Sequence, residues 1–317
     1  MKLLRKVVVL LTLSLGLTLP AVAADPPKGE AKAGSKDLVL KGDARCTTCH
    51  DEADAPELLA IGKTRHGVTA DGRTPTCTNC HGESKAHAEH KGKEKPPRTD
   101  VSFNRGTANS PEQRNGACLD CHQGGNRMHW AGSSHAGNDV TCNSCHKIHG
   151  QHDKSRSKAE QTEVCFSCHK SQRAEAHKAS HHAMLEGKVA CSSCHNPHGS
   201  TGPRMLVKNT INETCYMCHA DKRGPFLWEH PPATDNCMNC HAPHGSNHPA
   251  LLKTRQPYLC QQCHDFTQHP GNPYSGRGLP ASAGGTAPAQ QLLLRSCANC
   301  HTQVHGSNHP SGVRQTR

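Results

Sequence analysis

The sequence predicts a chain of loops and short α-helices with little β-structure, whose interior is not an ordinary core of apolar side chains. Three observations lead to this fold class. Only 33% of the 317 residues are hydrophobic and 3% are aromatic, which is too little to build the apolar core expected at this length. All 20 cysteines fall into Cys-x-x-Cys pairs. The intervals between these pairs are short, which favours loops and short helices. Either the chain is largely disordered or a group other than a side chain fills its interior.

The amino-terminal residues 1–24 are predicted to be a signal peptide. Lys2, Arg5 and Lys6 precede an apolar run at residues 7–19, and small residues follow it. A membrane anchor is the alternative, but the run is shorter than the about 20 residues that a membrane-spanning helix needs. We therefore expect the mature chain in the periplasm.

Every Cys-x-x-Cys pair is followed at once by a histidine. We number these ten motifs as sites 1 to 10 in chain order. They are Cys46/Cys49/His50, Cys77/Cys80/His81, Cys118/Cys121/His122, Cys142/Cys145/His146, Cys165/Cys168/His169, Cys191/Cys194/His195, Cys215/Cys218/His219, Cys237/Cys240/His241, Cys260/Cys263/His264 and Cys297/Cys300/His301.

This motif is the attachment signature of haem c. The two cysteines form thioethers with one porphyrin, and the histidine is the proximal ligand of its iron. A single Cys-x-x-Cys pair could also be half of a zinc site, a redox dithiol or a disulfide. None of these explains a histidine after every pair, and no cysteine is left over. The sequence predicts ten covalently bound haem c groups, which would supply the missing interior.

The remaining histidines supply candidates for the distal iron ligand. Ten of the 27 histidines belong to the motifs, so 17 remain. Methionine is the other common axial ligand, but Met217 and Met238 lie inside motifs, where they cannot reach an opposite haem face. We expect bis-histidine iron throughout, with distal ligands at His66, His87, His135, His149, His182, His198, His230, His244, His269 and His305.

These ten histidines were chosen because their order repeats. A motif is followed by a lone histidine, then by a second motif, then by a histidine three to six residues later. The repeat divides a decahaem domain, residues 46–305, into five two-haem units. We expect an elongated chain of ten haems built from these units, which span residues 46–117, 118–164, 165–214, 215–259 and 260–305.

The pairing of distal and proximal histidines stays open. His90 competes with His87 and His181 competes with His182, while the other histidines without a repeated position are taken as surface residues: His129, His152, His177, His248 and His309. A histidine only three residues after the proximal histidine of its own site is expected to coordinate the iron of a neighbouring haem and so to link adjacent units. A glycine follows His198, His244 and His305, which indicates a tight turn.

The rest of the chain is expected to be less ordered. Residues 25–45 form a flexible amino-terminal tail and residues 306–317 a carboxy-terminal tail. Residues 82–115 and 270–289 read as loops, because they are rich in charged residues and in Gly, Pro and Ala respectively. Short helices are predicted at residues 175–186 and 290–295.

The charge argues against a nucleic-acid partner. The formal net charge is +11, and losing Lys2, Arg5 and Lys6 lowers it by three to +8. The propionates and ferric irons of ten haems would bring it to about −2. Basic side chains are then expected to pair with propionates, for which arginine is the favoured donor.

The sequence resembles the MtrA/MtoA/DmsE family of periplasmic decahaem c-type cytochromes. The resemblance covers nearly the whole mature chain, and its most specific blocks are KRGPFLWEH at residues 222–230, LKTR at 252–255 with LCQQCH at 259–264, and VHGSNHP at 304–310. It implies a nearly linear haem wire inserted into a large outer-membrane β-barrel porin. Electrons would pass between periplasmic or inner-membrane cytochromes and an extracellular multihaem cytochrome or mineral.

The function expected is electron transfer, not bond-making catalysis. The leading hypothesis is a conduit across the outer membrane within a porin–cytochrome complex, serving iron oxidation or metal reduction. A soluble periplasmic electron shuttle makes the same haem predictions without a stable partner. A multihaem reductase of a small molecule needs an open iron position, whereas the histidines here suffice for every iron. The direction of flow, the terminal partner and the haem potentials are not encoded in these patterns.

Overall fold

The structure is a computed structural model, and it describes residues 44–68, 73–104, 106–264, 296–299, 301–310 and 312–315. Backbone contacts divide the chain into two parts, Met1–Lys36 and Asp37–Arg317, and all described residues belong to the second. Several expectations lie outside the described residues: the signal peptide at 1–24, nearly all of the tail at 25–45, His269, Cys300, the loop at 270–289 and the helix at 290–295.

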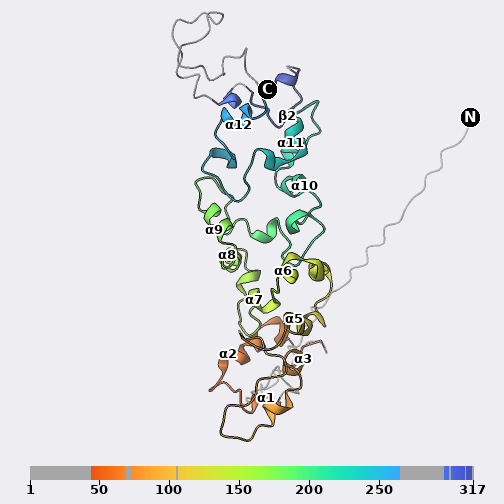
Figure 1. Cartoon of the computed structure of the whole chain (residues 1–317), viewed down its shortest axis with the longest axis vertical. Coiled ribbons are helices and arrows are strands. Elements are labelled where there is room, and N and C mark those ends of the chain that lie inside the picture. Colours follow the sequence, from red (N-terminus) through yellow and green to blue (C-terminus); the bar gives the residue numbers. More distant parts are fainter. Residues whose placement is uncertain are drawn as a thin grey trace, which may run out of the picture. The chain divides into compact units, whose positions relative to one another are not determined.

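Short helices are the main regular structure of the described residues, as predicted. The α-helices are α1 (Ala44–Thr47), α2 (Pro56–Leu59), α3 (Cys77–His81), α4 (Lys85–Ala88), α5 (Pro111–Leu119), α6 (Ser134–Gly137), α7 (Cys142–Cys145), α8 (Gln161–Phe166), α9 (Lys170–Ala176), α10 (Ile211–Tyr216), α11 (Pro231–Asp235) and α12 (Tyr258–Gln261). Figure 1 shows them following one another in chain order, from α1–α3 through α7–α9 to α11 and α12.

Single 3₁₀ turns connect these helices. They are η1 (Ala60–Lys63), η2 (Arg65–Gly67), η3 (Gly125–Arg127), η4 (Trp130–Gly132), η5 (Lys154–Arg156), η6 (Cys191–Ser193), η7 (Pro203–Met205), η8 (Ala220–Lys222), η9 (Cys237–Asn239), η10 (Pro249–Leu251), η12 (Cys297–Asn299) and η13 (Gly312–Arg314). Two short strands, β1 (Trp228–Glu229) and β2 (Gly306–Ser307), pair antiparallel, with Trp228 opposite Ser307. The predicted fold class, mostly loop with short helices and little strand, is confirmed.

The helix starts follow ordinary capping chemistry. At α5, Ser110 accepts a hydrogen bond from the backbone N–H of Gln113, and Pro111 occupies the first helical position. At α10, Thr210 accepts a hydrogen bond from the N–H of Glu213. Such caps matter here because helices this short gain little from propensity alone.

The structure differs from three local expectations. The helix expected at residues 175–186 is wrong: α9 ends at Ala176, and Ser180 instead exchanges backbone hydrogen bonds with Ser246. The loop expected at 82–115 contains α4 and the start of α5. In the segment taken as a carboxy-terminal tail, Gly306 and Ser307 are buried in β2, because they are paired with β1.

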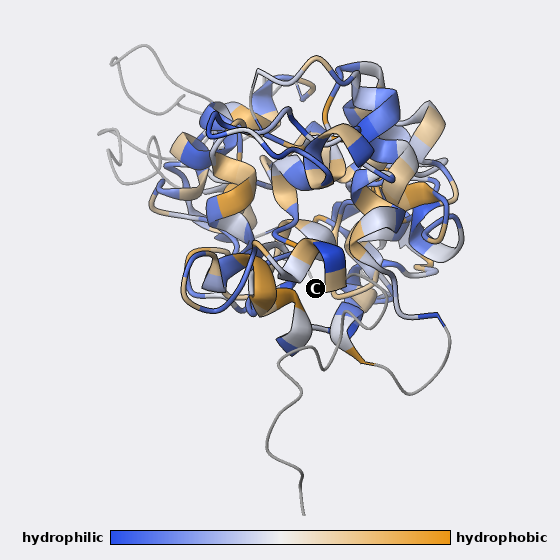
Figure 2. Cartoon of the chain, turned by 90° about the horizontal axis from the view of Figure 1, so that it is seen from below, coloured by the Kyte–Doolittle hydropathy of each residue, from blue (hydrophilic) through white to orange (hydrophobic). Residues whose placement is uncertain are grey.

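The side-chain core of the described residues is very small. The buried hydrophobic residues are Ala55, Phe166, Ala176, Met184 and Ala190, whereas ten polar residues are buried. Phe166, Ala176 and Met184 form one cluster, against which Val189 packs. Figure 2 shows hydrophobic residues scattered among hydrophilic ones instead of gathered in one block. Side chains alone therefore leave the interior unfilled, as the composition predicts.

None of the helices within the described ranges combines the length and apolar character needed to cross a membrane.

Candidate haem centres

Each attachment motif folds as one helical turn. At nine of the ten sites, the backbone N–H of the motif histidine donates to the carbonyl of the first cysteine four residues earlier, with N···O distances of 2.9–3.0 Å. At site 2 the same residues form helix α3. This turn brings both cysteines and the histidine to neighbouring positions on one short segment, as attachment to a single porphyrin requires.

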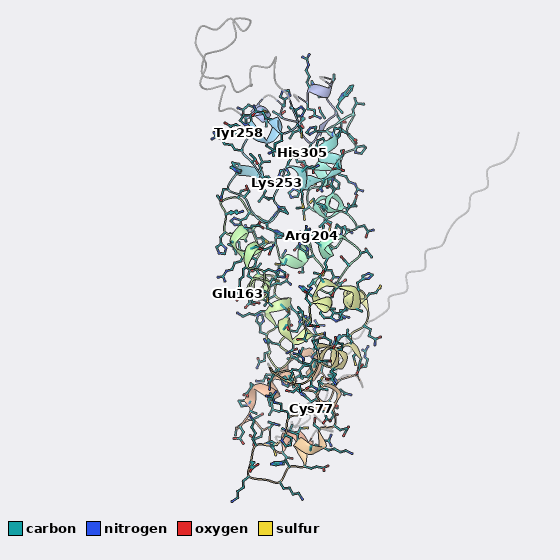
Figure 3. All side chains as sticks on the ribbon, viewed as in Figure 1. Cys77, Glu163, Arg204, Lys253, Tyr258 and His305 are labelled. Carbon is teal, nitrogen blue, oxygen red and sulfur yellow. The ribbon has the colours of Figure 1, made fainter. Side chains whose placement is uncertain are left out.

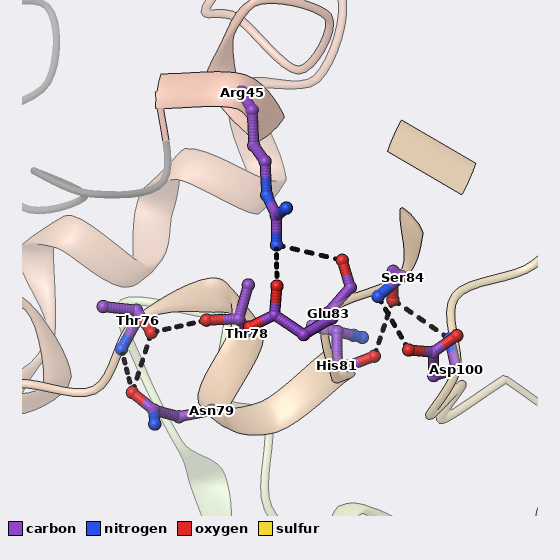
Figure 4. A network of polar contacts seen from close by, with 8 residues as sticks. All are labelled: Arg45, Thr76, Thr78, Asn79, His81, Glu83, Ser84 and Asp100. Carbon is purple, nitrogen blue, oxygen red and sulfur yellow. Dashed lines mark hydrogen bonds and ion pairs between the residues drawn. The ribbon is translucent and has the colours of Figure 1, made fainter. Parts of the chain in front are cut away.

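Odd-numbered and even-numbered sites differ in how their turn begins. At odd-numbered sites the first cysteine lies near the end of a helix, namely α1, α5, α8, α10 or α12. At even-numbered sites the first cysteine starts the turn, in α3, α7, η6, η9 or η12. The starting turns are capped locally: at site 2 the backbone N–H of Thr76 donates to Oδ1 of Asn79 over 2.8 Å (Figure 4).

Figure 4 also shows how the loop that follows site 2 is held. Ser84 has a positive φ of 48°, and its hydroxyl donates to the carbonyl of His81. Its backbone N–H donates to Asp100 Oδ2 over 2.7 Å, and Arg45 from site 1 pairs with Glu83 over 2.9 Å. These contacts join the chain around site 1 to the chain around site 2.

A side-chain amide links the two sites of a unit, and the sequence analysis did not identify it. Oδ1 of Asn115 accepts the backbone N–H of Cys142 over 2.9 Å, and Oδ1 of Asn212 accepts that of Cys237 over 2.8 Å. Gln161 and Gln256 accept N–H groups of sites 6 and 10 in the same way. The sequence feature that could have predicted this link is an Asn three residues, or a Gln four residues, before the first cysteine of an odd-numbered site.

The two sites of a unit also meet through their first cysteines. In units 2 to 5 the first cysteines of the two sites lie close to each other: Cys118 and Cys142, Cys165 and Cys191, Cys215 and Cys237, and Cys260 and Cys297. Before a haem is attached, the contact with Cys118 lowers the pKa of the Cys142 thiol to about 7, and the contact with Cys165 lowers that of Cys191 to about 7. The 19 described cysteines are free of disulfides, so they remain open to another covalent partner.

Nine pairs of imidazole rings face each other across gaps of similar width. The centroid distances are His50–His87 6.1 Å, His81–His149 6.2 Å, His122–His66 5.9 Å, His146–His198 6.1 Å, His169–His135 6.1 Å, His195–His244 6.2 Å, His219–His182 6.2 Å, His241–His305 6.1 Å and His264–His230 6.2 Å. Two metal–imidazole bonds of about 2 Å each, plus about 1 Å from each nitrogen to its ring centre, add up to about 6 Å. The gaps therefore fit one iron bound from both faces.

The pairs join each proximal histidine of sites 1–9 to one of the ten distal candidates. The lone histidine of one unit faces the odd-numbered site of the next unit, as His66 faces His122. The histidine that closes a unit faces the even-numbered site of the previous unit, as His149 faces His81. Unit 1 differs, because His87 faces His50 within the same unit. The partner of His301 is not fixed by these pairs, since the remaining candidate, His269, lies outside the described residues.

A backbone carbonyl holds the second ring nitrogen of eight of the eighteen paired histidines. The Nδ1–H groups of His135, His182 and His230 donate to Pro197, Pro243 and Val304 over 2.8 Å each. His87 and His149 donate to Pro97 and Leu58, and each even-numbered proximal histidine has an acceptor too. A held Nδ1–H leaves Nε2 unprotonated and aimed at the gap, which is the metal-binding form of imidazole. Burial lowers the pKa of His195 and of His198, which favours the same neutral form.

The glycines after three distal candidates allow close backbone contact. Gly199, Gly245 and Gly306 have positive φ values of 101°, 157° and 133°. A Cβ on Gly245 would lie 1.9 Å from the carbonyl oxygen of Glu175, and one on Gly199 would lie 2.4 Å from that of His129. Each glycine also closes a turn through its N–H. The expected tight turn is present, and it brings the chain against a neighbouring segment.

The competing histidines have other partners. His90 Nε2 donates to the carbonyl of Glu94, and His181 contacts the carbonyl of Lys178 and the carboxylate of Glu186. Their paired neighbours are His87 and His182.

A continuous cavity of about 4040 Å³ runs along the described residues. Its lining reaches from Lys63 to Gln315 and includes Cys118, Cys191, Cys297 and the paired rings of His146 and His198. In Figure 3, the labelled Cys77 and His305 lie near opposite ends of the elements in Figure 1. A single ligand pocket measures about 300–1,000 Å³, so this volume suits several large groups.

The lining of this cavity does not extend to site 1. Cys49 is exposed and lies outside the lining of this cavity, as do Cys46 and Cys77. The second cysteines of the other odd-numbered sites are exposed too, but they line the cavity: Cys121, Cys168, Cys218 and Cys263. The reason is the place of site 1 in the chain. It is the first of the series, so the described residues that could enclose it come only from the chain that follows it. The turn of site 1 is nevertheless formed, with the N–H of His50 3.0 Å from the carbonyl oxygen of Cys46, so a thioether at Cys49 stays a prediction from the motif.

Comparisons with known proteins identify the family to which this chain belongs. The family described as a doubled CXXCH motif matches residues 181–224 and 230–269, and the cytochrome c-type protein NrfB-like family matches residues 77–160. The chain is 47% identical over 277 residues to the multihaem cytochrome MtrA of Shewanella baltica, which covers 86% of this chain and 80% of that protein. The chain belongs to the MtrA family of multihaem cytochromes.

Two more distant relatives share the cytochrome c character of the MtrA family. The cytochrome c-type protein NrfB of Escherichia coli is 30% identical over 41% of this chain and 67% of its own length. That of Haemophilus influenzae is 28% identical over 45% of this chain and 70% of its own length. The predicted recognition is confirmed: the chain is a multihaem c-type cytochrome that binds haem covalently and transfers electrons.

Proposed function

We propose that the chain carries ten haem c groups with bis-histidine iron and conducts electrons across the outer membrane within a porin–cytochrome complex. The observation that carries the proposal is the set of nine ring pairs with gaps suited to iron. By elimination, His269 is the distal ligand opposite His301, so unit 5 would contain a pair within one unit, as unit 1 does with His50 and His87. Each haem iron supplies one-electron chemistry by cycling between its ferric and ferrous forms.

The contacts between sites support a serial path. Within units 2 to 5 the first cysteines of the two sites lie close to each other. Between units, Cys145 lies near Cys168, Cys194 near Cys218 and Cys240 near Cys263. Neighbours in the chain are therefore neighbours in space, from site 3 to site 10. Such an order favours transfer from each site to the next one.

A porin partner would reconcile this path with a membrane location. Hydrophilic and hydrophobic residues alternate along the described chain (Figure 2), and such a chain cannot expose its many loop amides to lipid. A wide β-barrel offers a lipid-facing exterior and a polar lumen. The likeness to MtrA supports this partner, a periplasmic location, and exchange with periplasmic or inner-membrane cytochromes and an extracellular multihaem cytochrome. The outer donor or acceptor would be iron or a metal mineral.

Two experiments test the proposal. Mass spectrometry of the mature chain should find ten added haems, and a ferric spectrum should be entirely low-spin. Purification from outer membranes should recover the cytochrome with a β-barrel protein at fixed stoichiometry. Recovery only as a free monomer would replace the conduit by a soluble periplasmic shuttle. A haem that binds carbon monoxide at once would instead point to a reductase with an open iron.

A further inference from the structure

Site 4 differs from the other even-numbered sites in what its proximal histidine touches. The Nδ1–H groups of the other four donate to backbone carbonyls: His81 to Val101 (2.9 Å), His195 to Arg204 (3.0 Å), His241 to Ala250 (2.8 Å) and His301 to Arg314 (2.5 Å). His146 instead donates to the carboxylate of Asp153, with Nδ1 2.7 Å from Oδ2. A charged acceptor thus stands where the repeats place a neutral one.

The carboxylate of Asp153 is held in place on both of its oxygens. The backbone N–H and the hydroxyl of Ser155 donate to Oδ1 over 3.1 and 2.7 Å, which leaves Oδ2 for the ring of His146. The side chains of Asp153 and His146 are 16% and 29% exposed. The nearby ammonium of Lys154 is paired with Glu163 over 2.9 Å. The negative charge is therefore directed at the imidazole and is partly shielded from water.

Another carboxylate approaches a paired histidine more loosely. Glu175 Oε2 lies 3.3 Å from Nδ1 of His244, and the two side chains are 36% and 35% exposed. This distance is longer than a normal hydrogen bond, and solvent weakens the interaction. Asp153 is the shorter and more buried of the two contacts.

A carboxylate on Nδ1–H makes an axial imidazole a stronger electron donor. The hydrogen bond moves the ring toward imidazolate, and the added negative charge favours the ferric state over the ferrous state. We propose that Asp153 is a positioning residue that lowers the reduction potential of the haem at site 4 below those of the other even-numbered sites. This inference rests on the proposed axial pair of His146 and His198, and is independent of the porin.

The consequence for electron transfer follows from the serial order of the sites. An electron that passes site 4 must occupy a haem whose reduction potential is lower than the potentials of the other even-numbered sites. Compared with the same site without the carboxylate, arrival of an electron at site 4 becomes less favourable and its departure more favourable by the same amount. This holds for flow in either direction, so Asp153 would tune the rate of transfer through site 4 without giving one direction a preference.

The test compares four variants of the full holoprotein by potentiometric titration followed in the visible spectrum. Asp153→Asn keeps the size of the side chain and removes its charge. Asp153→Glu restores the charge. Ser155→Ala removes the hydroxyl that holds Oδ1 and that also lies 2.9 Å from Nδ1 of His146. Glu213→Gln is the matched control, because it removes an exposed carboxylate that is paired with Arg223 and touches no paired imidazole. Haem content by mass and the low-spin spectrum are recorded for each variant.

The expected result is selective. In Asp153→Asn, about one tenth of the absorbance change moves to higher potential, as one haem of ten requires; Ser155→Ala moves the same fraction less far, and Asp153→Glu moves it back. Unchanged titration curves in Asp153→Asn and Ser155→Ala would overturn the inference, as would an equal shift in Glu213→Gln. If Asp153→Asn does not accumulate, Ser155→Ala decides between these outcomes. Fewer than ten haems or a high-spin signal in the unmodified protein would count against the proposed function instead.

Discussion

His135 donates its Nδ1–H to the carbonyl oxygen of Pro197 over 2.8 Å, and Pro197 directly precedes His198. The rings of His135 and His198 face the motif histidines of sites 5 and 4. One hydrogen bond therefore fixes the facing rings of two consecutive sites that belong to different units. The same relationship recurs from His182 to Pro243 and from His230 to Val304.

Replacing His182 should open one iron, whereas replacing its neighbour should not. In His182→Ala the ring opposite His219 is lost, so we expect one high-spin haem that binds carbon monoxide. In His181→Ala all haems should remain low-spin, because His181 contacts Lys178 and Glu186 instead. Visible spectra of the reduced proteins with carbon monoxide measure the difference. The opposite pattern would assign His181 as the ligand.

The ring planes predict one distinctive magnetic signature. His66 and His122 are crossed at 87°, whereas His50 and His87 are nearly parallel at 5°. Crossed axial imidazoles leave the iron orbitals nearly degenerate, which produces a strongly anisotropic low-spin signal in electron paramagnetic resonance. That signal should vanish in His66→Ala and persist in His87→Ala. Its survival in both variants would show that site 3 has different ligands.

Gly245 should not tolerate a side chain, although the glycine after another distal candidate should. Gly245→Ala would place a Cβ 1.9 Å from the carbonyl of Glu175 at a φ of 157°. We expect a loss of about 1–3 kcal/mol of unfolding free energy. Gly150→Ala, which follows His149, would meet nothing closer than 3.5 Å and should be nearly neutral. Urea unfolding of the two holoproteins compares them, and equal midpoints would contradict the close contact.

Asn115 should contribute more to stability than an exposed asparagine. It is buried, and Asn115→Ala leaves the backbone N–H of Cys142 without its acceptor. An unsatisfied buried donor costs about 1–3 kcal/mol. Asn209→Ala removes only an exposed contact with Thr201 and should cost well under that. Thermal unfolding followed by circular dichroism checks the pair, and a smaller effect at Asn115 would refute the link between sites 3 and 4.

Much of the architecture was predictable because its chemistry is local. A haem motif is read from five consecutive residues, and the lack of apolar residues predicts a small core. The distal candidates could be selected by their repeated order, but their partners could not be assigned. Which ring faces His122 depends on how the units pack against each other. The chain between the histidines is long enough to allow several different pairings.

Other features escaped prediction because they depend on tertiary contacts. The segment after α9 has residues suited to a helix, yet pairing between Ser180 and Ser246 holds it extended. The amide link of Asn212 appears only when its partner, the N–H of Cys237, is seen beside it. The role proposed for Asp153 likewise needs a distance, since nothing in the sequence separates it from other acidic residues.

The ring pairs that cross from unit to unit also make the completeness of one site depend on residues far along the chain. His50 and His87 pair within unit 1, but His81 needs His149 and His146 needs His198. A chain shortened before His198 would therefore leave the iron proposed at site 4 with an open coordination position, although its attachment motif is intact.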